Sequence, residues 1–294
     1  MAVQVTNEPG VAEVQPCRMD PLDLEAIEID LLLEAVHRAY GFDFREYSRA
    51  SLNRRVRGIV EAEHLPTVSA LQDLLLRDPE AVERFVLRMT VHTTAMFRDP
   101  PFYQALRSTV VPYLRTWPFV RIWDIGSSSG EEAYSLAIVL AEEGLLQRAL
   151  IYATDLSPAV LDRARAGVYP LRLMQEYTRN YIAAGGKRSF SEYYQAAHGN
   201  AIMRRDLGER IVFAQHDLTT DGSFNEFQLV LCRNVLIYFR EPLRDRIHRL
   251  AFGSLAPLGV LALGSREVLR STPFEAEYAT LDAENRLYQR RAPG

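Results

Sequence analysis

The stretch WDIGSSSGEEAYS, residues 123–135, joins an apolar segment to a helical pattern through a turn with glycines at positions 126 and 130. Such a turn is the usual build of a nucleotide-binding loop, because backbone N–H groups at the helix start point out of the sheet edge. Two glutamates, Glu131 and Glu132, stand where a phosphate would be expected. The ligand must therefore suit both a glycine-rich turn and negative charge.

The segments around this turn predict an α/β domain over residues 119–294. VRIWDI, ALIYATD, RIVFAQ, FQLVLC and GVLALG are predicted strands, and helices are expected over 131–143, 158–166 and 242–255. This alternation predicts βα units on a mainly parallel, doubly wound sheet. Between about residues 169 and 209 an aromatic-rich helical piece is followed by SFSEYYQAA, a turn at 198–200 and AIMRRDL. We expect an inserted subdomain with a small antiparallel sheet there.

The N-terminal part of the chain has helical patterns instead. A helix ends at Gly41, a C-cap residue, and two further helices are expected over 68–77 and 79–89. A helical stripe between them comprises Tyr47, Leu52, Val56, Ile59 and Val60. We predict an all-helical domain over 21–92 and a linker with a connecting helix over 93–118. Residues 1–20, which are polar and contain two prolines, are expected to form a mobile tail.

Composition narrows the class of protein. The 294 residues are 48% hydrophobic and 24% charged, which suits a soluble protein with one large and one smaller domain. Without a long apolar run or a signal-peptide pattern, a cytoplasmic protein without membrane insertion is expected. Two cysteines and six scattered histidines predict no structural metal, and the net charge of −4 argues against a general nucleic-acid binder. Nothing demands more than a monomer.

The two glutamates count against nucleotide cofactors. The turn reads GSSSG rather than GxGxxG, and each carboxylate would repel a pyrophosphate by roughly 1 kcal/mol. A ligand with an amino group and a sulfonium, such as S-adenosylmethionine, has the opposite preference. Asp155 ends the next strand, where a carboxylate can accept hydrogen bonds from ribose hydroxyls. The simpler alternatives are a tight turn whose glutamates complement the helix dipole, and a helix N-cap at Asp155.

Four motifs follow one another along the chain: TTAMFRDPPFY (93–103), SSGEEAYSLA (128–137), YATDLSPAVLDRARAGVYP (152–170) and LVLCRNVLIYF (229–239). Together they resemble the CheR-type chemotaxis receptor glutamate O-methyltransferases. The resemblance, which starts at about residue 23, implies an all-α N-terminal domain joined to a Rossmann-like S-adenosylmethionine-dependent methyltransferase domain with an inserted antiparallel β-subdomain. It implies methyl transfer to receptor glutamates, which yields glutamate methyl esters and S-adenosylhomocysteine.

The resemblance also implies residue roles. Arg98 and Tyr238 would face the reacting methyl group as catalytic residues. Of the two adjacent glutamates, about 100° apart on a helix, only one is expected to reach the cofactor, and the resemblance favours Glu132. The family often has asparagine at positions 92 and 217, and its turn often reads SAACSTG. The implied cofactor-binding set is His92, Thr94, Arg98, Glu131 or Glu132, Asp155, Asp217, Leu218, Cys232, Arg233 and Asn234.

This chemistry needs no general base, because a glutamate with a pKa of about 4.3 is already ionised at neutral pH. Arg98 could hold the substrate carboxylate through its fork of donors, and Tyr238 could position it. Arg54 and Arg57 lie on a basic helix face that is either simply solvated or meets the acidic signalling region of a methyl-accepting receptor.

Several alternatives stay open at this point. The inserted sheet is either a stability element or a dock for a receptor's C-terminal tail peptide. The chain as a whole could be an S-adenosylmethionine-dependent methyltransferase of another substrate class, or a non-catalytic signalling module that binds the cofactor.

Overall fold

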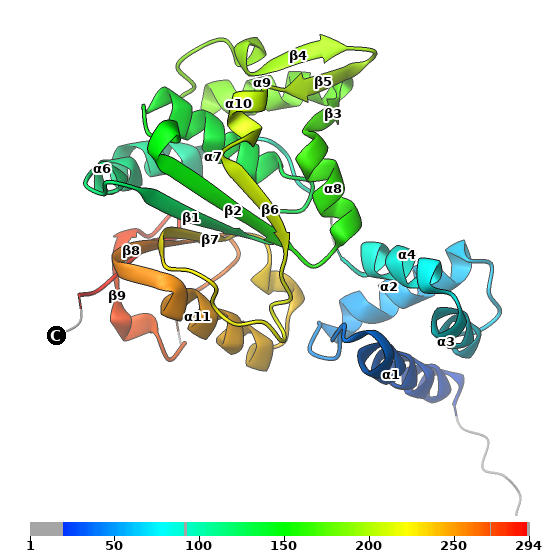
Figure 1. The fold of residues 1–294 in the computed structure, drawn as a ribbon. Coiled ribbons are helices and arrows are strands. Elements are labelled where there is room, and N and C mark those ends of the chain that lie inside the picture. Colours follow the sequence, from blue (N-terminus) through cyan, green and yellow to red (C-terminus); the bar gives the residue numbers. More distant parts are fainter. Residues whose placement is uncertain (1–19, 91–92, 271, 293–294) are drawn as a thin grey trace, which may run out of the picture.

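The computed structural model describes residues 20–90, 93–270 and 272–292, in which four N-terminal helices stand beside an α/β domain (Figure 1). The helices are α1 (Pro21–Tyr40), α2 (Arg49–Ala62), α3 (Val68–Arg77) and α4 (Pro79–Met89). The bounds of α3 and α4 are the predicted ones, and Gly41 ends α1 in the left-handed conformation with φ of 82°. The predicted tail lies outside the described residues except for Asp20, whose side chain accepts a hydrogen bond from Leu22 N at 2.8 Å and caps α1.

The helical domain has its own apolar core. Helix α2 buries Leu52, Val56 and Ile59, which confirms the predicted stripe at these positions. Tyr47 is also buried, although it precedes the helix. No helix among the described residues is long and apolar enough to cross a bilayer.

A connecting segment leads from this core to the sheet. It consists of α5 (Pro100–Ala105), a π-helical turn (Leu106–Val110) and α6 (Val111–Arg115). Phe102, Tyr103 and Leu106 of this segment are buried in the same apolar cluster as strand β1 (Val120–Ile125). The segment is therefore part of the α/β core rather than a free linker.

The large sheet has seven strands in the order β6-β2-β1-β7-β8-β10-β9. Strands β1, β2 (Ala149–Asp155), β6 (Ile211–Gln215), β7 (Phe227–Cys232) and β8 (Leu255–Leu263) run parallel, which confirms the five predicted strands. Strands β9 (Tyr278–Asp282) and β10 (Leu287–Arg290) form an antiparallel end that was not predicted, because both are short and partly polar. The chain leaves β1 toward β2 and β6, then returns to place β7 on its other side. The crevice at such a reversal is the usual ligand site of an open α/β sheet.

Helices cover both faces of the sheet. Figure 1 shows α7 (Glu131–Glu142) and α11 (Glu241–Ser254) on opposite sides, and α8 (Pro158–Ala166) follows β2. Strand β1 contributes side chains to the apolar cores on both faces of the sheet. Val120 and Ile122 pack in the core beside α7, and Trp123 and Ile125 pack in the core beside α11.

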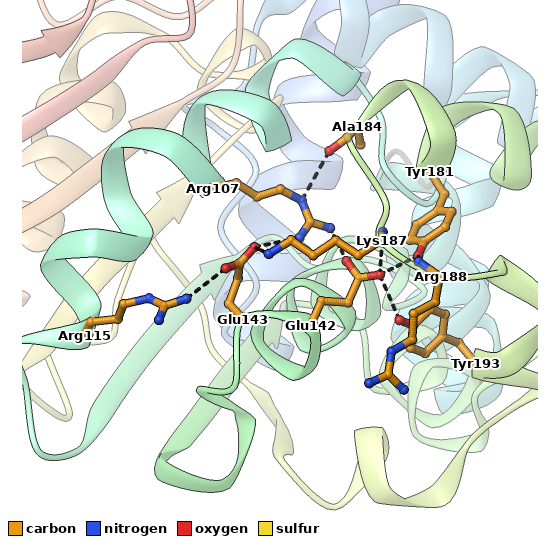
Figure 2. Close-up of polar contacts among 9 residues, drawn as sticks. All are labelled: Arg107, Arg115, Glu142, Glu143, Tyr181, Ala184, Lys187, Arg188 and Tyr193. Atoms are coloured by element: carbon orange, nitrogen blue, oxygen red, sulfur yellow. Dashed lines mark hydrogen bonds and ion pairs between the residues drawn. The ribbon is translucent and has the colours of Figure 1, made fainter.

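The predicted insertion is present as a separate three-stranded antiparallel sheet, in the order β3-β5-β4. It comprises β3 (Val168–Pro170), α9 (Met174–Ala183), β4 (Tyr194–Ala197), β5 (Asn200–Met203) and α10 (Arg205–Gly208). Figure 2 shows how it is tied to the end of α7: Tyr193 Oη donates to Glu142 Oε1 at 2.8 Å, and Tyr181 donates to the same carboxylate. The insertion therefore rests on the helix that begins at the glycine turn.

Candidate active site

Two adjoining cavities lie at the carboxyl ends of the central strands. The larger encloses about 680 Å³ and the smaller about 410 Å³, including the space at their mouths that is open to solvent. Gly126, Asn234 and Tyr238 line both. The larger cavity is also lined by Tyr47, Arg55, Thr90, Thr154, Asp155, Leu156, His216, Asp217, Leu218, Thr219, Val235 and Phe239. The smaller is also lined by Thr93, Thr94, Arg98, Ser127, Ser128, Glu132 and Arg233.

Three consecutive backbone donors at the start of the glycine turn are bonded within the protein. Gly126 N and Ser127 N donate to the Thr154 carbonyl at 2.8 and 2.9 Å, and Ser128 N donates to Asp155 Oδ2 at 3.0 Å. Gly126 has φ of +70°, and a Cβ added there would lie 2.6 Å from Val235 Cγ2. Glycine is thus required where the turn passes close to the segment after β7, and the turn is a wall rather than a phosphate cradle.

The two glutamates at the start of α7 point to different surroundings. Glu131 is buried, accepts hydrogen bonds from Ser129 Oγ at 2.7 Å and Tyr177 Oη at 3.3 Å, and lines neither cavity. Burial raises its pKa above the ordinary value. Glu132 lines the smaller cavity and pairs with Arg233. Only Glu132 is therefore placed to meet a ligand.

Arg233 lines the smaller cavity and joins several of its neighbours. Its buried side chain pairs with Glu132 and with Asp99 Oδ2 at 3.0 Å, and its guanidinium carbon lies 3.8 Å from the centroid of the Phe102 ring. Asp124 is buried next to this pair, and burial together with Glu132 raises its pKa well above the ordinary value. Asp124 therefore keeps a proton at a pH where an exposed aspartate has lost it.

The proposed catalytic pair meets at the smaller cavity. Arg98 and Tyr238 both line it, with Thr94 beside them. Arg98 Nη1 donates to the Thr93 carbonyl at 2.9 Å, which leaves further donors of the guanidinium fork. The predicted His92 lies outside the described residues.

Three of the predicted residues line the larger cavity and not the smaller: Asp155, Asp217 and Leu218. Asp155 Oδ1 accepts from Ser157 N at 3.1 Å at the start of α8, while Oδ2 holds the glycine turn. Asp217 Oδ1 accepts from Thr219 N at 2.7 Å and from Thr219 Oγ1 at 2.6 Å. Since a carboxylate oxygen can accept two hydrogen bonds, Thr219 satisfies this oxygen, and a ligand would meet Oδ2 of Asp217.

The segment after β7 depends on a residue that the sequence reasoning missed. Glu267 accepts hydrogen bonds from Val235 N and Leu236 N at 2.7 Å, from Asn234 N at 3.0 Å and from Gly264 N at 2.6 Å. This buried carboxylate fixes Asn234, whose φ is +61°. The predicted Cys232 is buried in the apolar cluster under α11 and lines neither cavity.

The N-terminal domain closes the site around Tyr238. Ser48 N donates to the Tyr238 carbonyl at 2.8 Å, and Tyr47 forms a β-bridge with Phe239. Tyr47 and Arg55 line the larger cavity. Arg55 was not predicted, and its only signal is its position beside the apolar stripe of α2.

The predicted basic face of α2 is largely offset by acids from α1. Arg57 Nε pairs with Glu25 at 2.6 Å, and Arg49 pairs with Asp30. Arg54 is exposed. The two predicted substrate-binding arginines thus differ, since only Arg57 belongs to an ion pair given by the structure.

The walls as a whole fit S-adenosylmethionine better than a nucleotide. The backbone N–H groups of residues 126–128 are bonded within the protein, and Glu132 lines the smaller cavity. A ligand with a positive amino group suits that wall, whereas a phosphate does not. Among the described residues no three metal-binding side chains cluster.

Family models match nearly the whole chain. The "CheR methyltransferase, all-alpha domain" matches residues 27–90, and the "CheR methyltransferase, SAM binding domain" matches residues 92–283. A "Putative methyltransferase Cher3" of Pseudomonas putida is 47% identical over 90% of this chain and 97% of its own length. A "Chemotaxis protein methyltransferase" of Listeria innocua is 31% identical over 84% and 92%. Among solved structures, the glycopeptide N-methyltransferase MtfA with sinefungin is 14% identical over 58% of this chain and 50% of that chain, with a TM-score of 0.35. The chain belongs to the CheR methyltransferase family.

Proposed function

We propose that this S-adenosylmethionine-dependent methyltransferase esterifies glutamate side chains of methyl-accepting chemotaxis receptors. The observation that carries the proposal is the convergence of Arg98, Glu132 and Tyr238 on one cavity that adjoins a second, larger cavity lined by Asp155. A carboxylate-binding arginine, an acid for the cofactor's amino group and a ribose-binding acid are the groups that this reaction needs. The family relationship supports the same conclusion.

The cofactor would span both cavities. Glu132 would bind its amino group, Asp155 its ribose, and Asp217 and Leu218 its adenine. Asn234, which lines both cavities, would stand near the middle. Thr94 and His92 complete the proposed set, and Arg233 would act by holding Glu132 in place.

S-adenosylmethionine supplies a methyl group on a sulfonium: the carboxylate oxygen bonds to the methyl carbon while the carbon–sulfur bond breaks, its electron pair stays on sulfur, and no proton moves. The protein's residues therefore need only to orient the carboxylate and exclude water. Arg98 would bind the carboxylate through its fork, and Tyr238 would direct it by its hydroxyl.

Receptor docking would involve the exposed part of α2. Arg54 is exposed, and Arg57 presents a charge that Glu25 partly neutralises. Replacing Arg54 and Arg57 by glutamate should weaken receptor methylation while cofactor affinity stays the same. Arg54→Glu alone should have most of this effect, since Arg57 is already paired. Unchanged receptor kinetics in both variants would remove α2 from the docking surface.

The inserted sheet is a further proposed contact, for a receptor's C-terminal tail. Strand β4 lies at the edge of the order β3-β5-β4, so an extended peptide could add to it as a fourth strand. Receptors truncated at the tail should then be methylated more slowly. Equal rates with full-length and truncated receptors would leave the sheet with a stability role.

One experiment separates this function from its alternatives. The protein is incubated with methyl-labelled S-adenosylmethionine and receptor-containing membranes, and base-labile label on the receptor marks a carboxyl ester. Arg98→Ala should abolish the label. Label only on other molecules would indicate another substrate class, and cofactor binding without transfer would indicate a non-catalytic module. The proposal includes action in the cytoplasm by a single copy of the chain. Analytical sedimentation in the presence of substrate tests whether the protein is a monomer.

A further inference from the structure

The segment that carries Arg98 has an uncommon backbone conformation. Phe97 has φ of +54° and Asp99 has φ of +58°, so Arg98 lies between two residues in the left-handed region. Aspartate adopts this region fairly readily, but a bulky residue such as phenylalanine is a true outlier there. Phe97 is also fully buried. Because strained backbone of this kind persists only where the surroundings enforce it, the contacts of Phe97 reveal what holds Arg98 in place.

Both ends of the peptide group that precedes Phe97 are held by side chains. Its N–H, which belongs to Phe97, donates to Ser135 Oγ of α7 at 2.9 Å. Its carbonyl, which belongs to Met96, accepts from Asn180 Nδ2 of α9 at 3.1 Å. The peptide group is planar, and the angle φ of Phe97 is a rotation about the bond that leaves it. These two hydrogen bonds therefore fix one side of that rotation.

The aromatic ring of Phe97 fixes the other side. Its centroid lies 5.0 Å from the ring of Tyr103 on α5, 5.2 Å from Tyr181 on α9 and 6.2 Å from Phe190. Rings at these distances pack closely, the last two edge to face, and leave the Phe97 ring little room to turn. The insertion supplies Asn180, Tyr181 and Phe190, so it contributes to both sides of the restraint.

Few other contacts fix the direction of the Arg98 side chain. Its Nη1 donates to the Thr93 carbonyl at 2.9 Å, which holds only the far end of the side chain. The Arg98 carbonyl accepts from Arg233 Nη2 at a longer distance of 3.4 Å. A guanidinium stands at the end of a long stem, so a small rotation of the backbone at Phe97 would move it far from the cavity that it lines.

We propose that Asn180 is a positioning residue for methyl transfer, which holds the Met96 carbonyl and thereby aims Arg98 at the smaller cavity. The inference rests on the proposed function, since it concerns the orientation of a substrate-binding arginine. Asn180 itself lines neither cavity, so it acts through Arg98 rather than on the substrate. The insertion is thereby part of the catalytic apparatus, in addition to any contact with a receptor tail.

The test measures receptor methylation and S-adenosylhomocysteine binding with the full-length protein. Asn180→Ala removes the donor to the Met96 carbonyl, whereas Asn180→Asp keeps the shape of the side chain but turns a carboxylate oxygen toward that carbonyl. We expect kcat/KM for receptor to fall about 10-fold in Asn180→Ala and about 100-fold in Asn180→Asp, the cost of a misplaced orienting group. The affinity for S-adenosylhomocysteine, measured by calorimetry, should stay within about twofold, because Glu132 and Asp155 lie on other elements.

Gln104→Ala is the matched control. Gln104 Nε2 donates to the Ala183 carbonyl at 2.5 Å, so it joins the connecting segment to α9 without touching the Met96 peptide group. Both measurements should stay within about twofold of the unaltered protein in this variant. Equal losses of kcat/KM in Gln104→Ala and Asn180→Ala would mean that any loosening of the insertion suffices, and would overturn the inference.

Three further results would also overturn it. One is an unchanged kcat/KM in Asn180→Ala, and another is a smaller loss in Asn180→Asp than in Asn180→Ala, which would mean that Asn180 only fills space. The third is a loss of S-adenosylhomocysteine affinity as large as the loss of transfer, which would assign Asn180 to cofactor binding. If Asn180→Asp does not fold, the comparison of Asn180→Ala with Gln104→Ala decides. Absence of ester label with the unaltered protein would instead sink the proposed function, and this inference with it.

Discussion

Helix α7 begins and ends with a pair of glutamates, and the two ends use them differently. At each end one glutamate accepts hydrogen bonds from tyrosines of the insertion: Glu131 from Tyr177, and Glu142 from Tyr181 and Tyr193. The other glutamate of each pair contacts cations, and Glu142 also pairs with Arg107. Glu132 pairs with the buried Arg233 at the wall of a cavity, whereas Glu143 pairs with Arg107, Arg115 and Lys187 (Figure 2).

The carboxyl groups at the two ends differ in their proton affinity. Burial raises the pKa of Asp124 and Glu131 near the start of α7. At the far end, burial also acts to raise the pKa of Glu142 and Glu143. Hydrogen bonds outweigh it, and the largest of these effects come from Tyr181 on Glu142 and from Lys187 on Glu143. Both pKa values therefore lie below the ordinary range. The same residue type is thus poised for a ligand at one end and anchors the insertion at the other. What differs is the number of donors within reach.

The largest effect expected from this comparison is the loss of methyl transfer in Glu132→Gln. Arg233, whose side chain is 1% exposed, would keep only Asp99 as a charged partner, and the cofactor's amino group would lose its proposed carboxylate. We expect kcat/KM to fall about 100-fold or more, with weaker S-adenosylhomocysteine binding by calorimetry. Glu131→Gln is the matched control, because its amide oxygen can still accept from Ser129 or Tyr177. A larger loss in Glu131→Gln than in Glu132→Gln would reverse the assignment.

The next effect is on stability, at the other end of α7. Glu142→Ala would leave Arg107, with a side chain 9% exposed, and the hydroxyls of Tyr181 and Tyr193 without their shared acceptor. We expect the free energy of unfolding to fall by about 3 kcal/mol, as measured by urea denaturation. Cofactor affinity of the folded protein should not change, because Glu142 lines neither cavity of the site. If the free energy of cofactor binding fell as much as the free energy of unfolding, the two ends of α7 would not have separate roles.

The contrast between the two ends also marks what the sequence could predict. Helical periodicity alone placed Glu131 and Glu132 in different directions, and the structure puts only Glu132 at a cavity. The five parallel strands were recognisable because each is a short segment dominated by apolar residues. Their ends located most of the candidate site.

The contacts that the sequence could not predict join segments far apart in the chain. Tyr193 is 51 residues from Glu142, and Glu267 is 33 residues from Asn234. Arg55 faces Tyr238 only because the helical domain packs against the segment after β7. The offset of the α2 arginines by Glu25 and Asp30 is of the same kind. A local pattern carries no information on such pairs.

The pH dependence of stability should show the two ends as opposite slopes. A raised pKa in the folded state means that the stability contributed by Asp124 is present below its unfolded value, near pH 4, and is lost as the pH rises through the folded value. The lowered pKa of Glu142 means that its contribution is present above about pH 4 and is lost as the pH falls through the folded value. Asp124→Asn should therefore flatten the alkaline side and Glu142→Gln the acid side, each by about 1 to 2 kcal/mol.

Denaturation midpoints measured from about pH 3 to pH 9 would check both slopes. Glu277→Gln is the control, because Glu277 is exposed and directly precedes β9, an edge strand of the large sheet. Equal effects of Asp124→Asn at acid and alkaline pH would contradict the assignment of a retained proton to Asp124.

The smallest effect is expected at Lys187, the sole lysine of the chain. Its Nζ lies 2.6 Å from Glu143 Oε1, but its side chain is 51% exposed, and Arg107 and Arg115 hold the same carboxylate. Lys187→Met leaves the backbone N–H of residue 187, which donates to Glu142 at 2.9 Å, in place. We expect a loss of about 0.5 kcal/mol in urea denaturation, which disappears in about 1 M salt because an exposed pair is screened. A loss as large as that of Glu142→Ala would mean that the charge of Lys187, rather than the shared tyrosine acceptor, holds the insertion on α7.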